Sequence, residues 1–251
     1  MMPSVDWSGV LSGEPAHWLF SGFIVTLGVT LVASVWATLV AIGLVGLSIS
    51  RLRPLEYANQ AMVAFFRNTP LLVQLLFWYF VGYGLLPQTF KFWLTTDRPW
   101  SVLPGNVSIL SPEFVSSVWG LGLFIGAFLS EEIRSGLNAV PLGQREAATS
   151  QGLSFRDTLI SILLPQALAK AYQPVVGQYL NLMKLSSLAC SIGLAEITYQ
   201  VRQIEGFNSH ALEAFAAGTL LYLGIGIGME RIFRLYRPRD FSGGDFSEGR
   251  S

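Results

Sequence analysis

The stretch that decides the fold runs from Ser21 to Ile49 and reads SGFIVTLGVTLVASVWATLVAIGLVGLSI. It contains no charged residue, and as a helix it is long enough to cross the roughly 30 Å hydrocarbon core of a bilayer with some tilt. A cleaved signal peptide carries basic residues before a shorter apolar core, but the first Lys or Arg here is Arg51, after the run. We therefore interpret this stretch as a retained transmembrane helix.

Four further apolar runs follow, at residues 68–90, 114–130, 171–197 and 214–229. The chain is 51% hydrophobic and 13% charged, about half the charged fraction of a soluble domain. Because lipid cannot satisfy open backbone polar groups, runs of this length form helices. The sequence predicts an all-α membrane protein with about five transmembrane helices, and an amphipathic helix over 55–66 that leads into the second run.

The distribution of basic residues predicts the orientation. With the N-terminus outside, the C-terminus in the cytoplasm and five alternating spans, most basic residues outside the spans fall on the cytoplasmic side, as the positive-inside rule requires. The cytoplasmic set is Arg51, Arg53, Arg134, Arg145, Arg156, Arg231, Arg234, Arg237, Arg239 and Arg250, against Lys91, Arg98 and Arg202 outside. We expect residues 1–20 to form an external segment, 21–237 a membrane domain, and 238–251 a flexible cytoplasmic tail.

Several classes of function lack support in the sequence. Cys190 is the only cysteine, and His17 and His210 lie far apart without ligand spacing, so we expect neither an internal disulfide nor a metal site. The formal net charge is zero, which gives no indication of a nucleic-acid partner. No lysine follows a glycine, so the phosphate-binding Gly-x4-Gly-Lys-Ser/Thr motif is absent. We expect a non-catalytic chain with no cofactor of its own.

The segment Glu146–Pro165, EAATSQGLSFRDTLISILLP, is polar and charged although it lies between two apolar runs. Ala147 and Ala148 favour a helix, and Gly152 is suited to end it because glycine readily adopts the left-handed conformation. On the predicted topology this segment faces the cytoplasm. A polar helical segment held there by two membrane spans is placed to meet a partner in the water.

The second half of this segment predicts another helix. Ser154 is placed to cap it, with Asp157 three residues later as an acidic variant of the capping box. Pro165 is expected to kink or end this helix near the membrane. The sequence therefore predicts a helix–turn–helix hairpin over 141–165, with Leu153 and Phe155 near its tip.

The full spacing of this segment resembles the EAA loop of binding-protein-dependent ABC importer permeases, in which Glu-Ala-Ala, a following Gly and a later Ile-x-Leu-Pro mark the coupling helix. Further blocks resemble the permeases for polar amino acids, and the spacing around Ser209-His210-Ala211 is most similar to permeases for glutamate and aspartate. These blocks are 66–74 (FRNTPLLVQ), 130–137 (SEEIRSGL), 140–146 (VPLGQRE) and 181–188 (NLMKLSSL). The resemblance covers most of residues 21–237 and implies a type I ABC importer permease fold in a bacterial inner membrane.

The resemblance also implies partners. These are a dimer of a cytoplasmic ABC ATPase that binds ATP and magnesium, a second and related permease subunit, and an amino-acid-binding protein in the periplasm, which residues 1–20 would then face. In the family the loop docks in a groove on the ATPase and transmits its closure to the membrane helices. Carried over to this chain, the loop residues are Glu146, Ala147, Ala148, Gly152, Leu153, Phe155 and Pro165.

Two sets of polar residues lie at membrane depth in the predicted spans. Gln178, Asn181 and Lys184 share one side of a helix, either as a stripe along the substrate pathway or as hydrogen-bonding residues between helices. Thr69, together with Asn68, precedes Pro70, where it is expected to bond the backbone groups that the proline frees and so to form a pivot. The alternative interpretation of residues 67–70 is that Arg67 anchors the helix at the membrane interface and a helix break follows it.

The sequence predicts the class of transporter more specifically than it predicts the substrate. Similar permeases for cationic amino acids carry carboxylates where Gln178 and Leu185 stand, so the resemblance favours glutamate or aspartate, with glutamine or another neutral polar amino acid as the alternative. An ion-coupled secondary carrier is a remote alternative, because it requires carboxylates within the membrane. The sequence places its acidic residues at the ends of spans, at Glu131, Glu132, Glu196 and Glu213. A membrane scaffold without transport fits the residues physically and is opposed only by the family resemblance.

Overall fold

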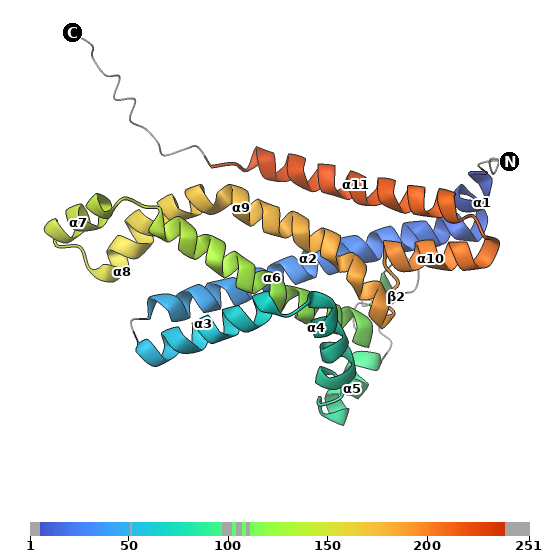
Figure 1. Cartoon of the computed structure of the whole chain (residues 1–251), viewed down its shortest axis with the longest axis horizontal. Coiled ribbons are helices and arrows are strands. Elements are labelled where there is room, and N and C mark those ends of the chain that lie inside the picture. Colours follow the sequence, from blue (N-terminus) through green and yellow to red (C-terminus); the bar gives the residue numbers. More distant parts are fainter. Residues whose placement is uncertain (1–5, 51, 97–101, 104–106, 109–110, 239–251) are drawn as a thin grey trace, which may run out of the picture.

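The computed structural model describes residues 6–50, 52–96, 102–103, 107–108 and 111–238. The long helices lie side by side along the longest axis of the molecule, and a short helical hairpin forms one end (Figure 1). The elements are α1 (Ser8–Leu11), α2 (Gly13–Ile49), α3 (Arg53–Asn68), α4 (Leu71–Phe77), the π-helix η1 (Trp78–Gly82), α5 (Gln88–Thr95), β1 (Val102–Leu103), β2 (Val107–Ser108), α6 (Pro112–Asn138), α7 (Leu142–Ser150), α8 (Phe155–Thr158), the π-helix η3 (Leu159–Leu163), α9 (Leu164–Leu185), the 3₁₀ helix η4 (Ser186–Ile192), α10 (Ile197–Asn208) and α11 (Ala211–Leu235). The two short strands pair antiparallel.

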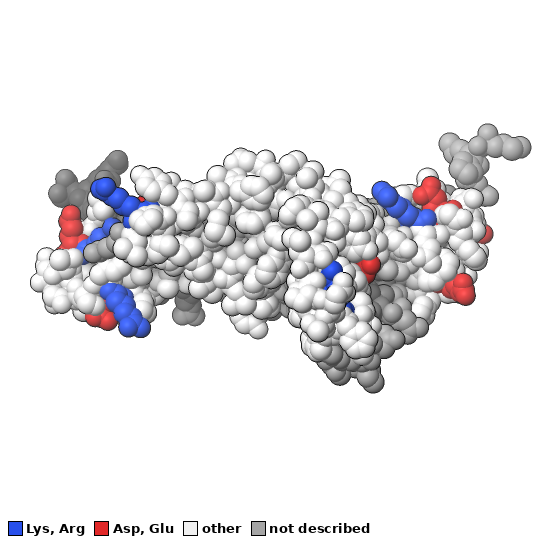
Figure 2. Space-filling model, turned by 90° about the horizontal axis from the view of Figure 1, so that it is seen from below, with Lys and Arg blue, Asp and Glu red and all other residues white. Residues whose placement is uncertain are grey.

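The expectation of about five spans is confirmed. Among the described residues, four helical stretches are long and apolar enough to cross a membrane, namely Gly13–Ile49, Pro112–Asn138, Phe155–Ile192 and Ala211–Leu235. A fifth is made by the pair Arg53–Asn68 and Leu71–Gly82, if the two are counted as one span. On the face seen in Figure 2 the charged residues gather toward the two ends, and most of the surface between them is uncharged. A bilayer fits around this uncharged band.

The prediction of one continuous second span over 68–90 is wrong. Helix ends at Gly82 within this run, and α5 begins separately at Gln88. The chain also bends by 103° between α3 and α4, at the start of the run, where the sequence predicts a pivot. Pro70 causes the bend because it has no N–H to donate and forces Thr69 into an extended conformation (φ −97°, ψ 136°). The predicted amphipathic helix over 55–66 is confirmed as the central part of α3.

Asn68 and Thr69 both bond backbone carbonyls at this corner, but the carbonyl that Pro70 frees, that of Phe66, is satisfied by Gln74 and not by the two predicted residues. Asn68 Nδ2 donates to the carbonyl of Ala64 at 2.8 Å, and the Thr69 hydroxyl donates to the carbonyl of Phe65. Gln74, which the sequence did not single out for this role, donates from Nε2 to the carbonyl of Phe66 at 2.9 Å and to Thr69 Oγ1 at 2.9 Å. Its side chain is buried, so it holds the inside of the corner.

The fourth span is also longer than predicted. Helical structure runs from Phe155 to Ile192, so it begins well before residue 171 and passes through Pro165. Pro165 therefore does not end the helix; it lies in the first turn of α9, and whether it kinks the helix stays a prediction. The π-helix η3 ends just before the proline, and a π-turn is one of the local adjustments that lets a helix continue past a residue without an N–H. The helix ends instead at Gly193, whose φ is 90°.

The centre of the bundle is the contact between α2 and α6, which depends on small residues. A β-carbon placed on Gly122 would lie 2.1 Å from Cδ1 of Trp36, and one on Gly126 would lie 3.0 Å from the carbonyl oxygen of Ala37. Ala37 itself is fully buried. Glycine at these positions lets the two helices approach closely, as small residues do in membrane helix pairs.

One sequence expectation falls largely outside the described residues. It is the flexible tail over 238–251, of which only residue 238 is described. The external segment 1–20 proves to contain α1 and the start of α2, which begins eight residues before the charge-free run. The orientation of the termini stays a prediction from the charge distribution.

Candidate functional site

The first helix of the predicted hairpin is α7, and Gly152 ends it as the sequence predicts. Gly152 has φ +77°, a conformation that costs glycine little and other residues more. Its N–H donates to the carbonyl of Thr149 at 3.0 Å, and the N–H of Leu153 donates to the carbonyl of Ala148 at 3.1 Å. These two bonds form a Schellman motif, which closes the helix and fixes the direction in which the chain leaves it.

The second helix begins at the predicted cap. The Ser154 hydroxyl accepts from the N–H of Asp157 at 3.2 Å and donates to the Asp157 carboxylate at 2.5 Å. The cap sets the turn between the helices, so that Leu153 and Phe155 project at the tip with 39% and 42% of their surfaces exposed. The product is a short hairpin with apolar side chains at its end, and Figure 1 shows α7 and α8 extending beyond the long helices.

The predicted loop residues divide between the outer surface and the interior of the hairpin. Glu146 and Ala147 are exposed on α7, and Pro165 is exposed at the start of α9. Ala148 is only 2% exposed, so it packs the two halves of the hairpin together and presents no contact surface. Of the predicted loop residues only Ala148 is buried; Glu146, Ala147, Gly152, Leu153, Phe155 and Pro165 are exposed.

The hairpin is joined firmly to two membrane helices. Val140, Leu163 and Ala167 form a buried cluster where α6, η3 and α9 meet. Lys170 Nζ donates to the carbonyl of Ala139 at 2.9 Å and thereby satisfies a carbonyl at the end of α6. A β-carbon on Gly136 would lie 2.4 Å from the carbonyl oxygen of Ala167, so α6 and α9 touch through their backbones here. The base of the hairpin is thus fixed to both helices by packing and by a hydrogen bond.

The polar residues of α9 are not equivalent. Gln178 is half-buried, and its Nε2 donates to Oε1 of Glu132 on α6 at 3.2 Å. Asn181 and Lys184, farther along the helix, are exposed. Gln178 thus fits the reading of a bond between helices, whereas Asn181 and Lys184 remain free to face a pathway. Thr69 belongs to the α3–α4 corner, where its hydroxyl accepts from Gln74.

Glu196 lies just beyond the end of the fourth span, Phe155–Ile192, as the sequence predicts, but its burial was not predicted. It is fully buried and caps α10, accepting from the N–H groups of Thr198 at 3.0 Å and Tyr199 at 2.9 Å. The hydroxyl of Tyr222, from the middle of α11, also donates to it. The signal that could have found this role is an acidic residue directly before a helical pattern. Its donors give it a structural explanation.

The long helices and the hairpin between them are matched by the family model described as binding-protein-dependent transport system inner membrane component, over residues 33–240. The chain belongs to this family. The permease is therefore a multi-pass component of the inner membrane and a non-catalytic part of a transport system. Its EAA-like loop lies in the segment that links its third and fourth membrane-spanning elements.

Two relatives and one solved structure illustrate this membership. The permease is 34% identical to the glutamate/aspartate import permease protein GltJ of Escherichia coli (strain K12), over 88% of this chain and 89% of that protein. It is 30% identical to the probable glutamine ABC transporter permease protein GlnP of Bacillus subtilis (strain 168), over 94% and 99%. Its fold matches a chain from the crystal structure of an amino acid ABC transporter with histidines, with TM-score 0.75, 23% identity and coverage of 93% and 98%.

Proposed function

We propose that this permease is a membrane-spanning subunit of an ATP-driven importer that moves glutamate or aspartate across the bacterial inner membrane. It works with a dimer of an ABC ATPase, a second and related permease, and a periplasmic binding protein. ATP and magnesium bind on the ATPase. The observation that carries the proposal is the hairpin α7–α8, whose tip is apolar and exposed while its base is fixed to α6 and α9.

The hairpin acts as the coupling element in this proposal. A rigid knob with Leu153 and Phe155 at its tip can be gripped by a groove on the ATPase, and the charges of Glu146, Arg145 and Arg156 surround it. When the ATPase dimer closes, the hairpin moves as a unit, because its turn and its base are both fixed by hydrogen bonds and packing. Through α6 and α9 this rigid-body movement opens the pathway on one side and closes it on the other.

The coupling role is tested at Gly152, where the backbone conformation gives matched variants. Gly152→Asn keeps the left-handed conformation accessible, whereas Gly152→Val disfavours it strongly. We expect Gly152→Asn to transport and to co-purify with the ATPase nearly as the wild type does, and Gly152→Val to lose both while the membrane domain stays folded. Unchanged uptake by Gly152→Val would refute the coupling role.

An acidic substrate is supported by the polar face of α9 and by the relatives. Lys184 is exposed there beside the neutral Asn181, and an ammonium group attracts a carboxylate. The carboxylate of Glu132 accepts a hydrogen bond from the Gln178 amide. It does not belong to the exposed pair Asn181 and Lys184. Glutamine is the alternative, because GlnP is a glutamine transporter permease by name and is nearly as similar as GltJ.

The choice between these substrates is tested by uptake into proteoliposomes that contain the complete transporter and its binding protein. Labelled glutamate is competed with aspartate, glutamine and arginine in turn. We expect aspartate to compete and arginine to have no effect, and Lys184→Gln to lower glutamate uptake more than any residual glutamine uptake. Glutamine transport that exceeds glutamate transport would show that the alternative is right.

A further inference from the structure

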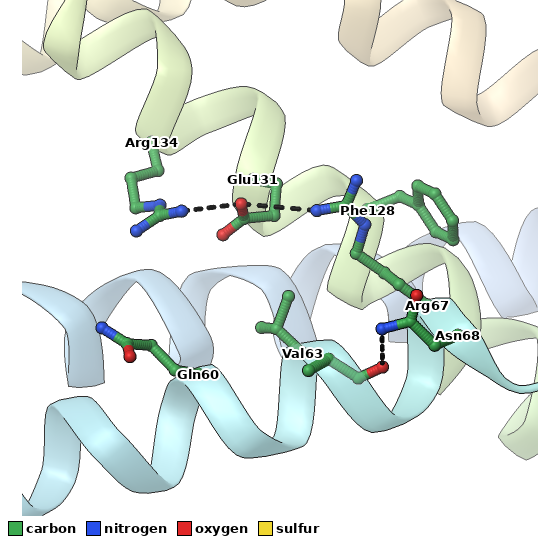
Figure 3. A pocket seen from close by; sticks show the side chains of 8 residues that line it. Gln60, Val63, Arg67, Asn68, Phe128, Glu131 and Arg134 are labelled. Carbon is green, nitrogen blue, oxygen red and sulfur yellow. Dashed lines mark hydrogen bonds and ion pairs between the residues drawn. The ribbon is translucent and has the colours of Figure 1, made fainter.

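A cavity of about 410 Å³ lies between the C-terminal half of α3 and the last turns of α6. Its polar lining comes from Gln60, Arg67 and Asn68 on α3 and from Glu131 and Arg134 on α6 (Figure 3). None of these residues belongs to the hairpin or to the polar face of α9. The proposed transport function leaves this cavity without a role.

The charges that line the cavity do not balance. Oε2 of Glu131 accepts from Nη2 of Arg134 at 2.7 Å and lies 3.4 Å from Nη1 of Arg67. One carboxylate is thus shared by two guanidinium groups, which together hold ten N–H donors. Figure 3 shows the two arginines approaching Glu131 from opposite sides. The cluster carries one surplus positive charge and many donors that a second anion can use.

The two arginine side chains are partly exposed, and that of Arg67 is fixed in position by a neighbouring ring. Their side chains are 40% and 44% exposed, for Arg67 and Arg134 respectively. The guanidinium carbon of Arg67 lies 5.0 Å from the centre of the Phe128 ring, and this cation–π contact fixes the group in place. A planar guanidinium held in this way is suited to bind a phosphate with two parallel hydrogen bonds.

The surroundings of the cavity indicate which oxyanion fits. Glu131 and Arg134 lie in the last two turns of α6, about 6–11 Å from its end at 1.5 Å per residue, so the cluster sits near the end of a membrane span, where lipid headgroups lie. The apolar part of the cavity lining is formed by Val63 and Ala64 on α3 and Phe128 on α6. A ligand that joins a phosphate to acyl chains would cover both the charged and the apolar surface.

We propose that this cavity binds the phosphate of an anionic phospholipid, with Arg67 and Arg134 as the phosphate-binding residues. The acyl chains leave the cavity past its apolar lining residues Val63 and Phe128. Basic pockets between membrane helices are a common means of holding such headgroups. Because Arg67 directly precedes the α3–α4 corner, a bound phosphate bridges that corner to α6.

The test uses the full-length permease, purified with any subunits that accompany it, in nanodiscs that contain phosphatidylcholine and a minor fraction of phosphatidylglycerol. Native mass spectrometry counts the lipids that stay bound. We expect phosphatidylglycerol to be retained over phosphatidylcholine, and Arg67→Gln and Arg134→Gln each to weaken its retention about tenfold. The matched control is Arg234→Gln, which removes an exposed arginine on α11 that pairs with Glu230 at 2.8 Å; we expect it to change nothing.

Glu131→Gln separates binding from folding, because the two roles predict opposite results. If the cavity binds a phosphate, removing the carboxylate frees both arginines and tightens retention of phosphatidylglycerol. If the cluster only holds α3 to α6, Glu131→Gln weakens the structure and retention falls as in Arg67→Gln, which overturns the proposal. Equal retention of both lipids also overturns it. Displacement of the lipid by inorganic phosphate at low concentration would assign the site to free phosphate instead.

Discussion

Gly136→Ala should separate α6 from α9 at the base of the coupling hairpin. A β-carbon at this position would lie 2.4 Å from the carbonyl oxygen of Ala167 and 3.0 Å from the β-carbon of Ala171. Ordinary contacts of this kind begin at about 3.4 Å, so α9 must retreat by about 1 Å, and no rotamer change can relieve an overlap with a backbone oxygen. Overpacking of this size costs about 1–3 kcal/mol, against a gain in helix propensity of at most about 1 kcal/mol for Gly→Ala.

The net expectation is a loss of about 1–2 kcal/mol, which lowers the midpoint of thermal unfolding by about 2–4 °C per kcal/mol for a chain of this size. Gly177→Ala is the matched control, because Gly177 also lies within a helix, on α9, and a β-carbon there meets nothing within 4 Å among the described residues. Both variants are measured in detergent by thermal unfolding, and their transport is measured in proteoliposomes. Gly136→Ala should lose stability and transport together.

The reasoning would be refuted if the two variants unfolded at the same temperature. It would also be refuted if Gly136→Ala lost stability but kept full ATP-driven transport, because the contact would then hold the fold without carrying the hairpin's movement.

Three further predictions follow from single contacts. Gln74→Leu should lower the free energy of unfolding by about 1–3 kcal/mol, because the carbonyl of Phe66 loses its buried donor; Gln151→Leu, at an exposed position, should have little effect in the same thermal assay. Ser154→Ala should destabilise the hairpin by about 1 kcal/mol through loss of the cap, seen as faster proteolysis there, and Ser154→Asp should restore resistance. Phe155→Ser should abolish co-purification with the ATPase without lowering the unfolding temperature, and retained ATPase would contradict a contact at the tip.

The hairpin was predictable from the sequence because its geometry is local. Gly152, Ser154 and Asp157 determine a helix end and a helix start through bonds that reach no farther than six residues along the chain. The corner at Pro70 was predictable as a break for the same reason. The angle of this corner and the end of helix at Gly82 could not be predicted, because nothing in the apolar run over 68–90 marks where helix ends. Pro165 does not end the helix, because the π-helix directly before it is a local adjustment that lets helix continue past a residue without an N–H.

Most contacts that sequence reasoning missed depend on partners far along the chain; the exception is Gln74, whose partners Phe66 and Thr69 are eight and five residues away. Glu132 meets Gln178 across 46 residues, and Glu131 meets Arg67 across 64. Ala148 could not be recognised as interior, since its burial requires the second half of the hairpin to fold against it. Glu196 reads as the end of an apolar run, but packing between α2, α10 and α11 buries it.

By itself the sequence determined that the chain is a helical membrane protein with a polar hairpin between two spans, and it carried the motif of the coupling loop. Those properties follow from the length of apolar runs and from caps and glycines, which act within a few residues. Only the tertiary structure decided which side chains of the loop face outward, how Gly136 joins α6 to α9, and that Arg67 and Arg134 share one carboxylate. These depend on which helices lie side by side, and that is decided by the packing of all the spans together.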